Sequence, residues 1–392
     1  MITHPCPLKN DIHREKYVAL KQPKSVNLRP RQIKKNISNS LIMKKLILLS
    51  TFLLSIIHGY SIIRTLNNQS GFSANFTDLP SAIAGSSNGD TLYIQPSSID
   101  YGNATLSKRL FIIGGGHNPD YSPYNSSMTN LIFANGATGS VIKGLKIAYI
   151  SASSSVIVND VLISGCYIES SLPFNLSSGI TLNNWVFEGN VISSIAAQIE
   201  LAYSGANWIF RNNFLQAFST SVFFTSISDG TLFDHNILYQ YGANFNTLAA
   251  STNGSGVIFR NNIMLTNGSS VSSTLINGAG SSTFQNNLTW GISSSFPDLG
   301  VSNITDVNPN FADVSGGYLF NYVSDYNLLS SSQGIDAATD GTDIGLYGGI
   351  FNFSQRGFDA GTPRVEDFTL TTPSAPAGGT ITIHLKAHGS GQ

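Results

Sequence analysis

A short pattern returns at nearly constant spacing through the middle of the chain. It consists of an aromatic residue, a polar residue, a small or polar residue, Asn and then an apolar residue. Five copies follow it: Phe187–Ile192, Phe210–Leu215, Phe233–Leu238, Phe259–Met264 and Phe284–Thr289. Two earlier segments, Ile142–Ile147 and Ile163–Ile168, fit it with Leu145 or Cys166 in place of Asn. From Leu145 to Asn287 the successive spacings are 21, 24, 23, 23, 26 and 25 residues, which indicates a stack of repeated units.

A unit of this length holds three short strands and three bends, which is one coil of a parallel β-helix. Helical repeats would need long runs of 3.6-residue period, and the chain has none. We expect each Phe to point inward and each Asn to lie at a bend, where Asn tolerates the left-handed backbone conformation. Stacked Asn side chains can also satisfy polar groups that the bend buries. We therefore expect Asn190, Asn213, Asn236, Asn262 and Asn287 to form one structural column.

Further strands are predicted in the stretches before each copy, which are followed by Gly-, Ser- or Asn-rich turns. The candidates are Ser154–Asn159, Gly179–Asn183, Gln198–Tyr203, Ser221–Ser226, Phe245–Ala250 and Ser273–Gly278.

From about Phe76 to Gly349 the chain resembles the right-handed parallel β-helix proteins of the pectate-lyase-like superfamily, in their exported bacterial form. Ala82–Ala84 and Gly89–Ile94 resemble the capping helix and first strand of that family, and Lys108–Gly114 its entry into the second coil. Val307–Phe311 and Asp336–Gly349 resemble the segment that closes the last coil. The resemblance implies an all-β solenoid with a short N-terminal capping helix, and we expect a small C-terminal β tail after it.

The charges are unevenly placed along the chain. Residues 1–61 hold 11 of the 21 Lys and Arg but 2 of the 22 Asp and Glu, which leaves 10 basic and 20 acidic residues in the rest. Because Lys and Arg supply most of the affinity for phosphate backbones, this acidic remainder argues against nucleic-acid binding.

Residues 43–61 read as a secretory signal. Met43-Lys44-Lys45 precedes the apolar run Leu46–Ile57, which is too short to span a bilayer, and small residues follow at cleavage spacing. We predict cleavage near Ser61 and a secreted, cell-surface or periplasmic protein without a membrane span. Residues 1–42 are an overlong start or a disordered leader, residues 62–349 form the β-helix, and residues 350–392 form the tail. Cleavage would leave Cys166 without a disulfide partner, and we expect a monomer.

One set of residues suggests chemistry. The position after each repeated Phe carries Glu188, Arg211, Asp234, Arg260 and Gln285, and His235 follows Asp234. As a site, this column offers an acid, a base and a histidine on one surface. As structure, it is a ladder of alternating charges on neighbouring coils, and the alternation of sign favours that interpretation.

Other chemistry is less well supported by the sequence. Asp336, Asp340 and Asp343 could bind Ca²⁺, but their spacing differs from that of a dedicated calcium loop, so turn capping is favoured. No other cofactor is expected. Tyr121, Tyr124, Trp185, Trp208 and Trp290 could stack against sugars, but such residues more often pack in a core or a turn.

The family's lyases use carboxylates that bind Ca²⁺ and a Lys or Arg base, and its hydrolases use grouped aspartates. Neither pattern is evident here. The sequence therefore favours a protein that binds a polysaccharide or has a structural role outside the cell, over a polysaccharide lyase or glycoside hydrolase with an altered site.

Overall fold

The computed structural model describes residues 44, 61–120, 123–169, 179–194, 205–218, 227–241, 254–266, 282–292, 300–351, 353–357, 364–370 and 374–388. The chain divides into two compact units, Met1–Tyr60 and Ser61–Gln392. All elements below belong to the second unit. No helix in the described part of the chain is long and apolar enough to cross a bilayer.

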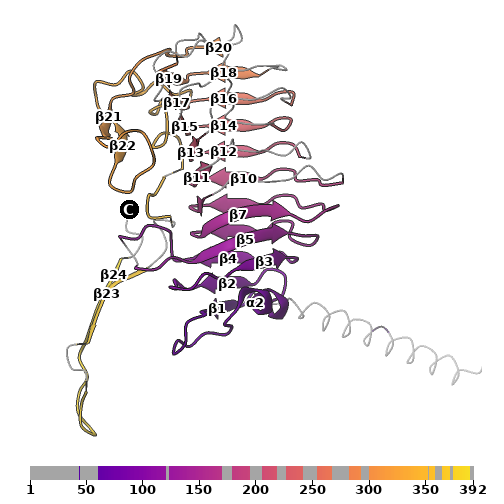
Figure 1. Cartoon of the computed structure of the whole chain (residues 1–392), viewed down its shortest axis with the longest axis vertical. Helices are drawn as coiled ribbons and strands as arrows, with labels where there is room; N and C mark the ends of the chain where they lie inside the picture. Colours follow the sequence, from indigo (N-terminus) through magenta and orange to yellow (C-terminus); the bar gives the residue numbers. More distant parts are fainter. Residues whose placement is uncertain are drawn as a thin grey trace, which may run out of the picture. The chain divides into compact units, whose positions relative to one another are not determined.

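Two parallel sheets dominate the described residues (Figure 1). Sheet 1 has eleven described strands, in the order β1 (Ile63–Leu66), β2 (Thr91–Ile94), β4 (Phe111–Gly114), β6 (Val141–Lys143), β8 (Leu162–Ser164), β10 (Val186–Glu188), β12 (Ile209–Arg211), β14 (Leu232–Asp234), β16 (Ile258–Arg260), β18 (Thr283–Gln285) and β20 (Gly300–Val301). Sheet 2 has nine, in the order β3 (Asn103–Leu106), β5 (Ser127–Phe133), β7 (Lys146–Ala152), β9 (Tyr167–Ile168), β11 (Val191–Ser194), β13 (Phe214–Ala217), β15 (Ile237–Gln240), β17 (Ile263–Thr266) and β19 (Leu288–Trp290). From β2 to β20, successive strands of the chain alternate between the sheets, which confirms the predicted parallel β-helix.

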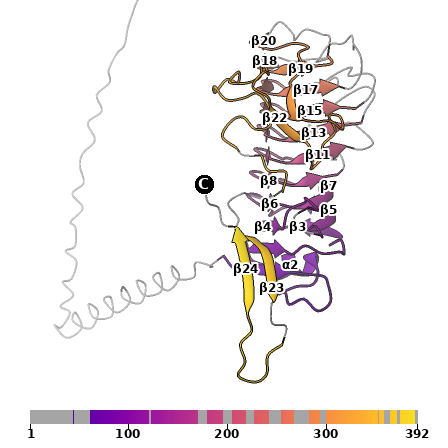
Figure 2. The same cartoon turned by 90° about the vertical axis from the view of Figure 1, so that its left-hand side faces the viewer.

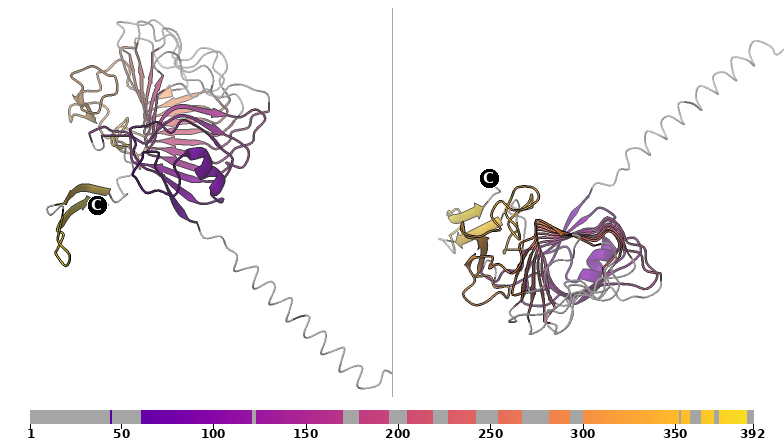
Figure 3. Two further views of the ribbon diagram at one scale, coloured as in Figure 1. Left: turned by 60° about the horizontal axis from the view of Figure 1, so that its bottom comes forward. Right: turned by 90° about the horizontal axis from the view of Figure 1, so that it is seen from above.

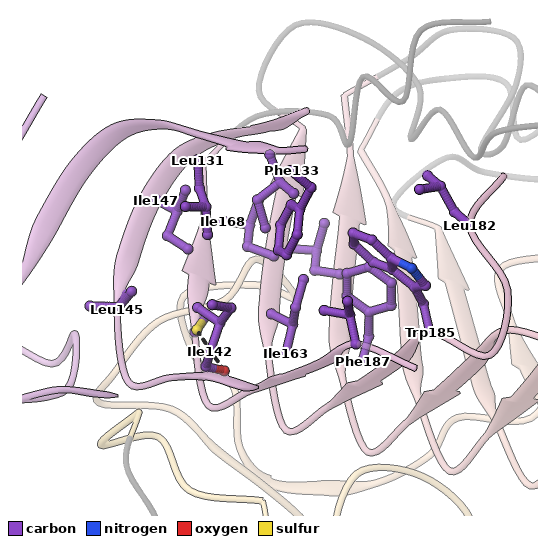
Figure 4. Close-up of a cluster of buried hydrophobic side chains, with 14 of the residues drawn as sticks. Leu131, Phe133, Ile142, Leu145, Ile147, Ile163, Ile168, Leu182, Trp185 and Phe187 are labelled. Carbon is purple, nitrogen blue, oxygen red and sulfur yellow. Dashed lines mark hydrogen bonds between the residues drawn. The ribbon is translucent and has the colours of Figure 1, made fainter. Parts of the chain in front are cut away.

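The view down the stack shows the strands of each sheet lying above one another (Figure 3). The interior between the sheets is apolar and closely packed, as the side chains in Figure 4 show. Five phenylalanines of the repeat form a continuous stack, with neighbouring rings 4.5–5.0 Å apart and within 9° of parallel. All five are fully buried, as predicted: Phe187, Phe210, Phe233, Phe259 and Phe284.

The repeated asparagines form the predicted column, and each is fully buried. In Asn190, Asn213, Asn236 and Asn262, the backbone N–H and the side-chain amide both donate to the side-chain oxygen of the next Asn, at 2.9–3.0 Å. Asn287 does the same with Asn303, which extends the column by one residue. Cys166 begins it, because its N–H donates to Asn190.

The left-handed backbone is one residue away from its predicted position. The residue before each column member has positive φ: Gly189, Asn212, His235, Asn261, Asn286 and Ser302. The column asparagines thus serve hydrogen bonding, and the bend is made by their predecessors.

Helix α2 (Leu79–Gly85) lies where the sequence predicts a capping helix. The Asp78 carboxylate accepts a hydrogen bond from Ser81 at its start. The Lys108 ammonium donates to the carbonyls of Ile83, Ala84 and Ser86 at its end. Because a helix end leaves carbonyls unpaired, Lys108 both satisfies them and ties the helix to the second coil.

The segment after β20 was expected to close the last coil, but it folds back over sheet 2. β21 (Phe311–Asp313) and β22 (Asp325–Leu328) pair antiparallel and, with the residues around them, cover the outward face of β11 to β19 (Figure 2). This second core buries Phe214, Tyr239 and Leu265 from sheet 2 against Phe311 and Tyr326.

Residues 336–351 and 353–357 then run back along the corner between the two sheets, and we call them the corner strap. Asn286 donates to Ala337, Asn261 to Thr339, and Asn212 to Leu346 and Gly348. Further back, the strap reaches Gly189 through Phe351 and Gly144 through Gly357. Asp336–Gly349 therefore does not close the last coil, because its polar contacts are made by the left-handed residues of several coils.

The remaining strands, β23 (Arg364–Leu370) and β24 (Ile383–His388), form an antiparallel hairpin, which is the small C-terminal β tail. Of the further strands predicted before each repeat, Ser154–Asn159 and Gly179–Asn183 share one isolated bridge, Ile157 with Thr181. The other four candidates lie wholly outside the described residues. The right hand of the coil stays a prediction.

Candidate functional site

The predicted charge column lies on the outward face of sheet 1. Parallel pairing places Glu188, Arg211, Asp234, Arg260 and Gln285 at the same register on five consecutive strands. Arg211 Nε donates to Glu188 at 2.9 Å, and Arg260 Nη2 donates to Asp234 at 2.7 Å. The two arginine side chains are more than a third exposed, whereas the Glu188 and Asp234 side chains are 8% and 16% exposed. The column thus consists of two ion pairs with recessed carboxylates.

Asp234 is the most heavily constrained member. Its second oxygen, Oδ1, lies 2.9 Å from His235 Nδ1 and accepts a hydrogen bond from Asn261. Burial acts to raise the pKa of Asp234, but hydrogen bonds from His235 and Arg260, and their charges, lower it to about 2. The same bond to Asp234 raises the pKa of Arg260. A carboxylate held ionised by three donors is poorly suited to exchange protons near neutral pH.

His235 does not face solvent with the column. It occupies the left-handed bend and is 2% exposed. Its Nε2 lies 3.3 Å from the Thr342 hydroxyl and 3.7 Å from Asp340, both on the corner strap. Its ring faces the Gly348–Gly349 backbone, where an added Cβ would collide with it. The structure thus separates His235 from the open face and places it in the contact with the strap.

The three aspartates proposed for Ca²⁺ lie on the strap, and the side chains of two of them hold its turns. Asp343 accepts the N–H of Asp336 at 3.0 Å, and Asp340 accepts both the N–H and the hydroxyl of Thr342. Burial acts to raise the pKa of Asp340, but the bonds from Thr342 and the charge of His235 lower it. Within the described ranges, no three His, Cys, Asp or Glu side chains group as metal ligands do.

Two of the five aromatic candidates cannot stack against a sugar, because the rings of Trp185 and Trp208 are fully buried. Their indole N–H groups donate to the carbonyls of Val158 and Leu182. Trp290 packs against the second core, Tyr124 is 47% exposed, and Tyr121 lies outside the described residues.

A groove that the sequence analysis missed lies on sheet 1 near its N-terminal end. Its volume is about 520 Å³, and it crosses β1, β2, β4, β6 and β8. The lining is mostly apolar, with Tyr93, Phe111 and Lys143 among its side chains: the rest are Ile63, Thr91, Ile113, Val141 and Leu162, beside Gly114 and Gly144. The lining positions could have been identified from the alternation of side chains along a strand. Leu92, Ile112 and Ile142 point inward, so the residues on either side of each point outward.

Phe111 and its surroundings combine flat and charged groups. The Arg109 guanidinium lies 5.7 Å from the centre of the Phe111 ring. Lys143 occupies the same register as Ile113 on the preceding strand and Ser164 on the next, so the groove leads directly into the charge column.

Comparison with known proteins gives a likeness at the level of fold. No family model and no curated protein matches the chain. Among solved structures, the crystal structure of pectate lyase Pel9A matches with 13% identity and a TM-score of 0.39, over 75% of this chain and 97% of that one. The parallel β-helix is established by the strand pairing itself.

Proposed function

We propose that this protein is an exported, non-catalytic β-helix that binds polysaccharide in the groove on sheet 1. The observation that carries the proposal is the groove itself. Its volume lies in the range of small-ligand sites, and an apolar lining with a few polar groups is typical of them. Sugars present apolar C–H faces that pack on rings such as Tyr93 and Phe111.

The polar groups of the groove suit a sugar chain as well. The Tyr93 and Thr91 hydroxyls can exchange hydrogen bonds with sugar hydroxyls. The Lys143 ammonium can bind a hydroxyl or a carboxylate. We therefore expect a chain with both neutral and acidic sugars to bind better than a purely neutral one.

The charge column supports a binding protein over an enzyme. Arg211 and Arg260 are paired with carboxylates, so neither is an available base, and Asp234 is held ionised. The alternative is a polysaccharide lyase or glycoside hydrolase whose catalytic groups lie elsewhere in the chain.

Binding is tested with the purified full chain against a panel of soluble polysaccharides, by isothermal titration calorimetry. Tyr93→Ala and Lys143→Gln should each weaken binding at least about tenfold, since each removes a direct contact. Tyr149→Ala is the matched control, because Tyr149 is an exposed tyrosine on sheet 2. Wild-type affinity in both groove variants, or a loss in Tyr149→Ala, would contradict the groove assignment.

The same samples separate the two functions. Each polysaccharide is followed for new reducing ends and for the ultraviolet absorbance of unsaturated uronic products. Turnover that persists in the binding reaction and falls in a groove variant would establish the enzyme instead.

A further inference from the structure

The outward face of sheet 1 carries an apolar stripe beside the charge column. It is formed by the first residue of each strand from β6 to β16: Val141, Leu162, Val186, Ile209, Leu232 and Ile258. All six are partly exposed. The outward apolar residues of sheet 2 in the same coils, such as Val191, Phe214 and Ile237, are fully buried by the second core. Parallel sheets normally have both faces covered, so the stripe is an unusual surface.

The signs of the charge column have a specific symmetry. Along the stack they run negative at Glu188, positive at Arg211, negative at Asp234 and positive at Arg260. Read in reverse order, the same column runs positive, negative, positive, negative. The column is therefore complementary to an antiparallel copy of itself and opposes like charges in a parallel one.

We propose that two copies of this chain associate through the outward faces of sheet 1, antiparallel, about a two-fold axis between β12 and β14. Arg211 then faces the partner's Asp234, and Glu188 faces the partner's Arg260. In the stripe, Ile209 faces the partner's Leu232 and Val186 faces the partner's Ile258. An isologous interface requires this exchange of positions, and the stripe and the column satisfy it together.

The register covers one end of the groove and leaves the other end accessible, because β6 and β8, with Val141, Lys143 and Leu162, lie inside the overlap. Counting outward from the axis, β6 lies opposite the partner's β20, so eight strands overlap over about 38 Å. β1, β2 and β4, which carry Tyr93 and Phe111, lie beyond the overlap at each end. The dimer therefore leaves the part of each groove on β1, β2 and β4 exposed, and its formation does not depend on polysaccharide binding.

The decisive variant rearranges charge without changing its amount. The double variant E188R/R211E keeps the net charge and allows the 188–211 ion pair within one chain. It makes the column positive, negative, negative, positive, so that like charges meet across the axis. Sedimentation velocity over a concentration series should show a reversible dimer for the full chain and a dissociation constant raised at least about tenfold in the variant.

The matched control is K146E/E169K, which exchanges the partners of a surface ion pair on the sheet 2 side of the coil. It should dimerise like wild type. If E188R/R211E melts earlier than wild type, Leu232→Asp replaces it, with Ile157→Asp as an exposed apolar control away from the stripe. A strictly monomeric wild type, a dimer that survives both E188R/R211E and Leu232→Asp, or a dimer lost in either control would overturn the proposal.

Discussion

The side-chain oxygen of Asn236 accepts two hydrogen bonds from Asn213, one from its backbone N–H at 2.9 Å and one from its side-chain amide at 3.0 Å. The amide of Asn236 in turn donates to the Phe210 carbonyl. One side chain thus pairs two backbone groups of the preceding coil in a region without solvent access.

Asn236→Ala should lower the free energy of unfolding by roughly 2–4 kcal/mol, because it leaves the Asn213 N–H buried without its acceptor and removes a donor from the buried Phe210 carbonyl. Asn103→Ala, at an exposed position of β3, should have an effect within about 0.5 kcal/mol. Urea unfolding of both variants measures the difference. Equal stability of the two variants would show that the asparagine column contributes little to the free energy of unfolding.

Phe233→Ala should lower the free energy of unfolding by about 3–5 kcal/mol, because the Phe233 ring is stacked between Phe210 and Phe259 and its removal leaves a cavity. Phe72→Ala is the control, since Phe72 is 60% exposed. Because coils contact mainly their neighbours, hydrogen exchange should accelerate first in β12, β14 and β16. An unchanged thermal melt would place the ring outside the core.

Arg211→Gln should destabilise the protein by about 1 kcal/mol or less, since the guanidinium is more than a third exposed. The difference from wild type should shrink as salt is added. Polysaccharide affinity should stay at the wild-type level. A loss of binding or turnover without loss of stability would instead assign the column to a functional site.

The low pKa of Asp234 predicts how the stability of the fold depends on pH in acid. This pKa is about 2 in the folded protein, below the ordinary aspartate value of 3.8, so the folded state favours the ionised form. The resulting stabilisation is fully present above the unfolded pKa and is lost as pH falls from about 4 towards 2. Asp234→Asn should therefore show a shallower loss of stability over that interval. Parallel curves for the two proteins, from chemical unfolding at each pH, would exclude this contribution.

Gly189→Ala separates backbone strain from the contact with the strap. Both Gly189 and Gly102 have positive φ, but only at Gly189 would a Cβ collide with the Phe351 ring. Gly102→Ala should cost about 1–2 kcal/mol from backbone strain alone. Gly189→Ala should lower the free energy of unfolding by more than Gly102→Ala does. Adding Phe351→Ala to Gly189→Ala should restore this additional loss, as measured by a double-mutant cycle of urea unfolding.

The repeat was predictable because its physics is local to each coil. An inward Phe and a buried Asn recur at a spacing that only stacked coils satisfy, so Phe233 and Asn236 could be placed from sequence. The exact bend could not be placed, because Gly189, Asn212 and His235 share a backbone conformation but no side-chain chemistry.

Contacts between distant segments were not predictable in the same way. His235 looked like part of a charged face because it follows Asp234, yet Thr342, more than a hundred residues later, lies within hydrogen-bonding distance of it under the strap. The groove likewise needs strands from β1 to β8 to be stacked before Tyr93 and Lys143 can be seen to share a surface.

The corner strap has a consequence for how this protein can change in length. The asparagine column could accept an additional coil anywhere, because each member only repeats the bonds of the one before. The strap could not, because Asn212, Asn261 and Asn286 bind it at fixed residues. A duplicated coil between β14 and β16 would separate those anchors by about 4.8 Å more. The strap would then need about one or two added residues in extended conformation. Insertion of a coil between β14 and β16 and lengthening of the corner strap should therefore arise together in evolution. The length of the strap thus limits the number of coils.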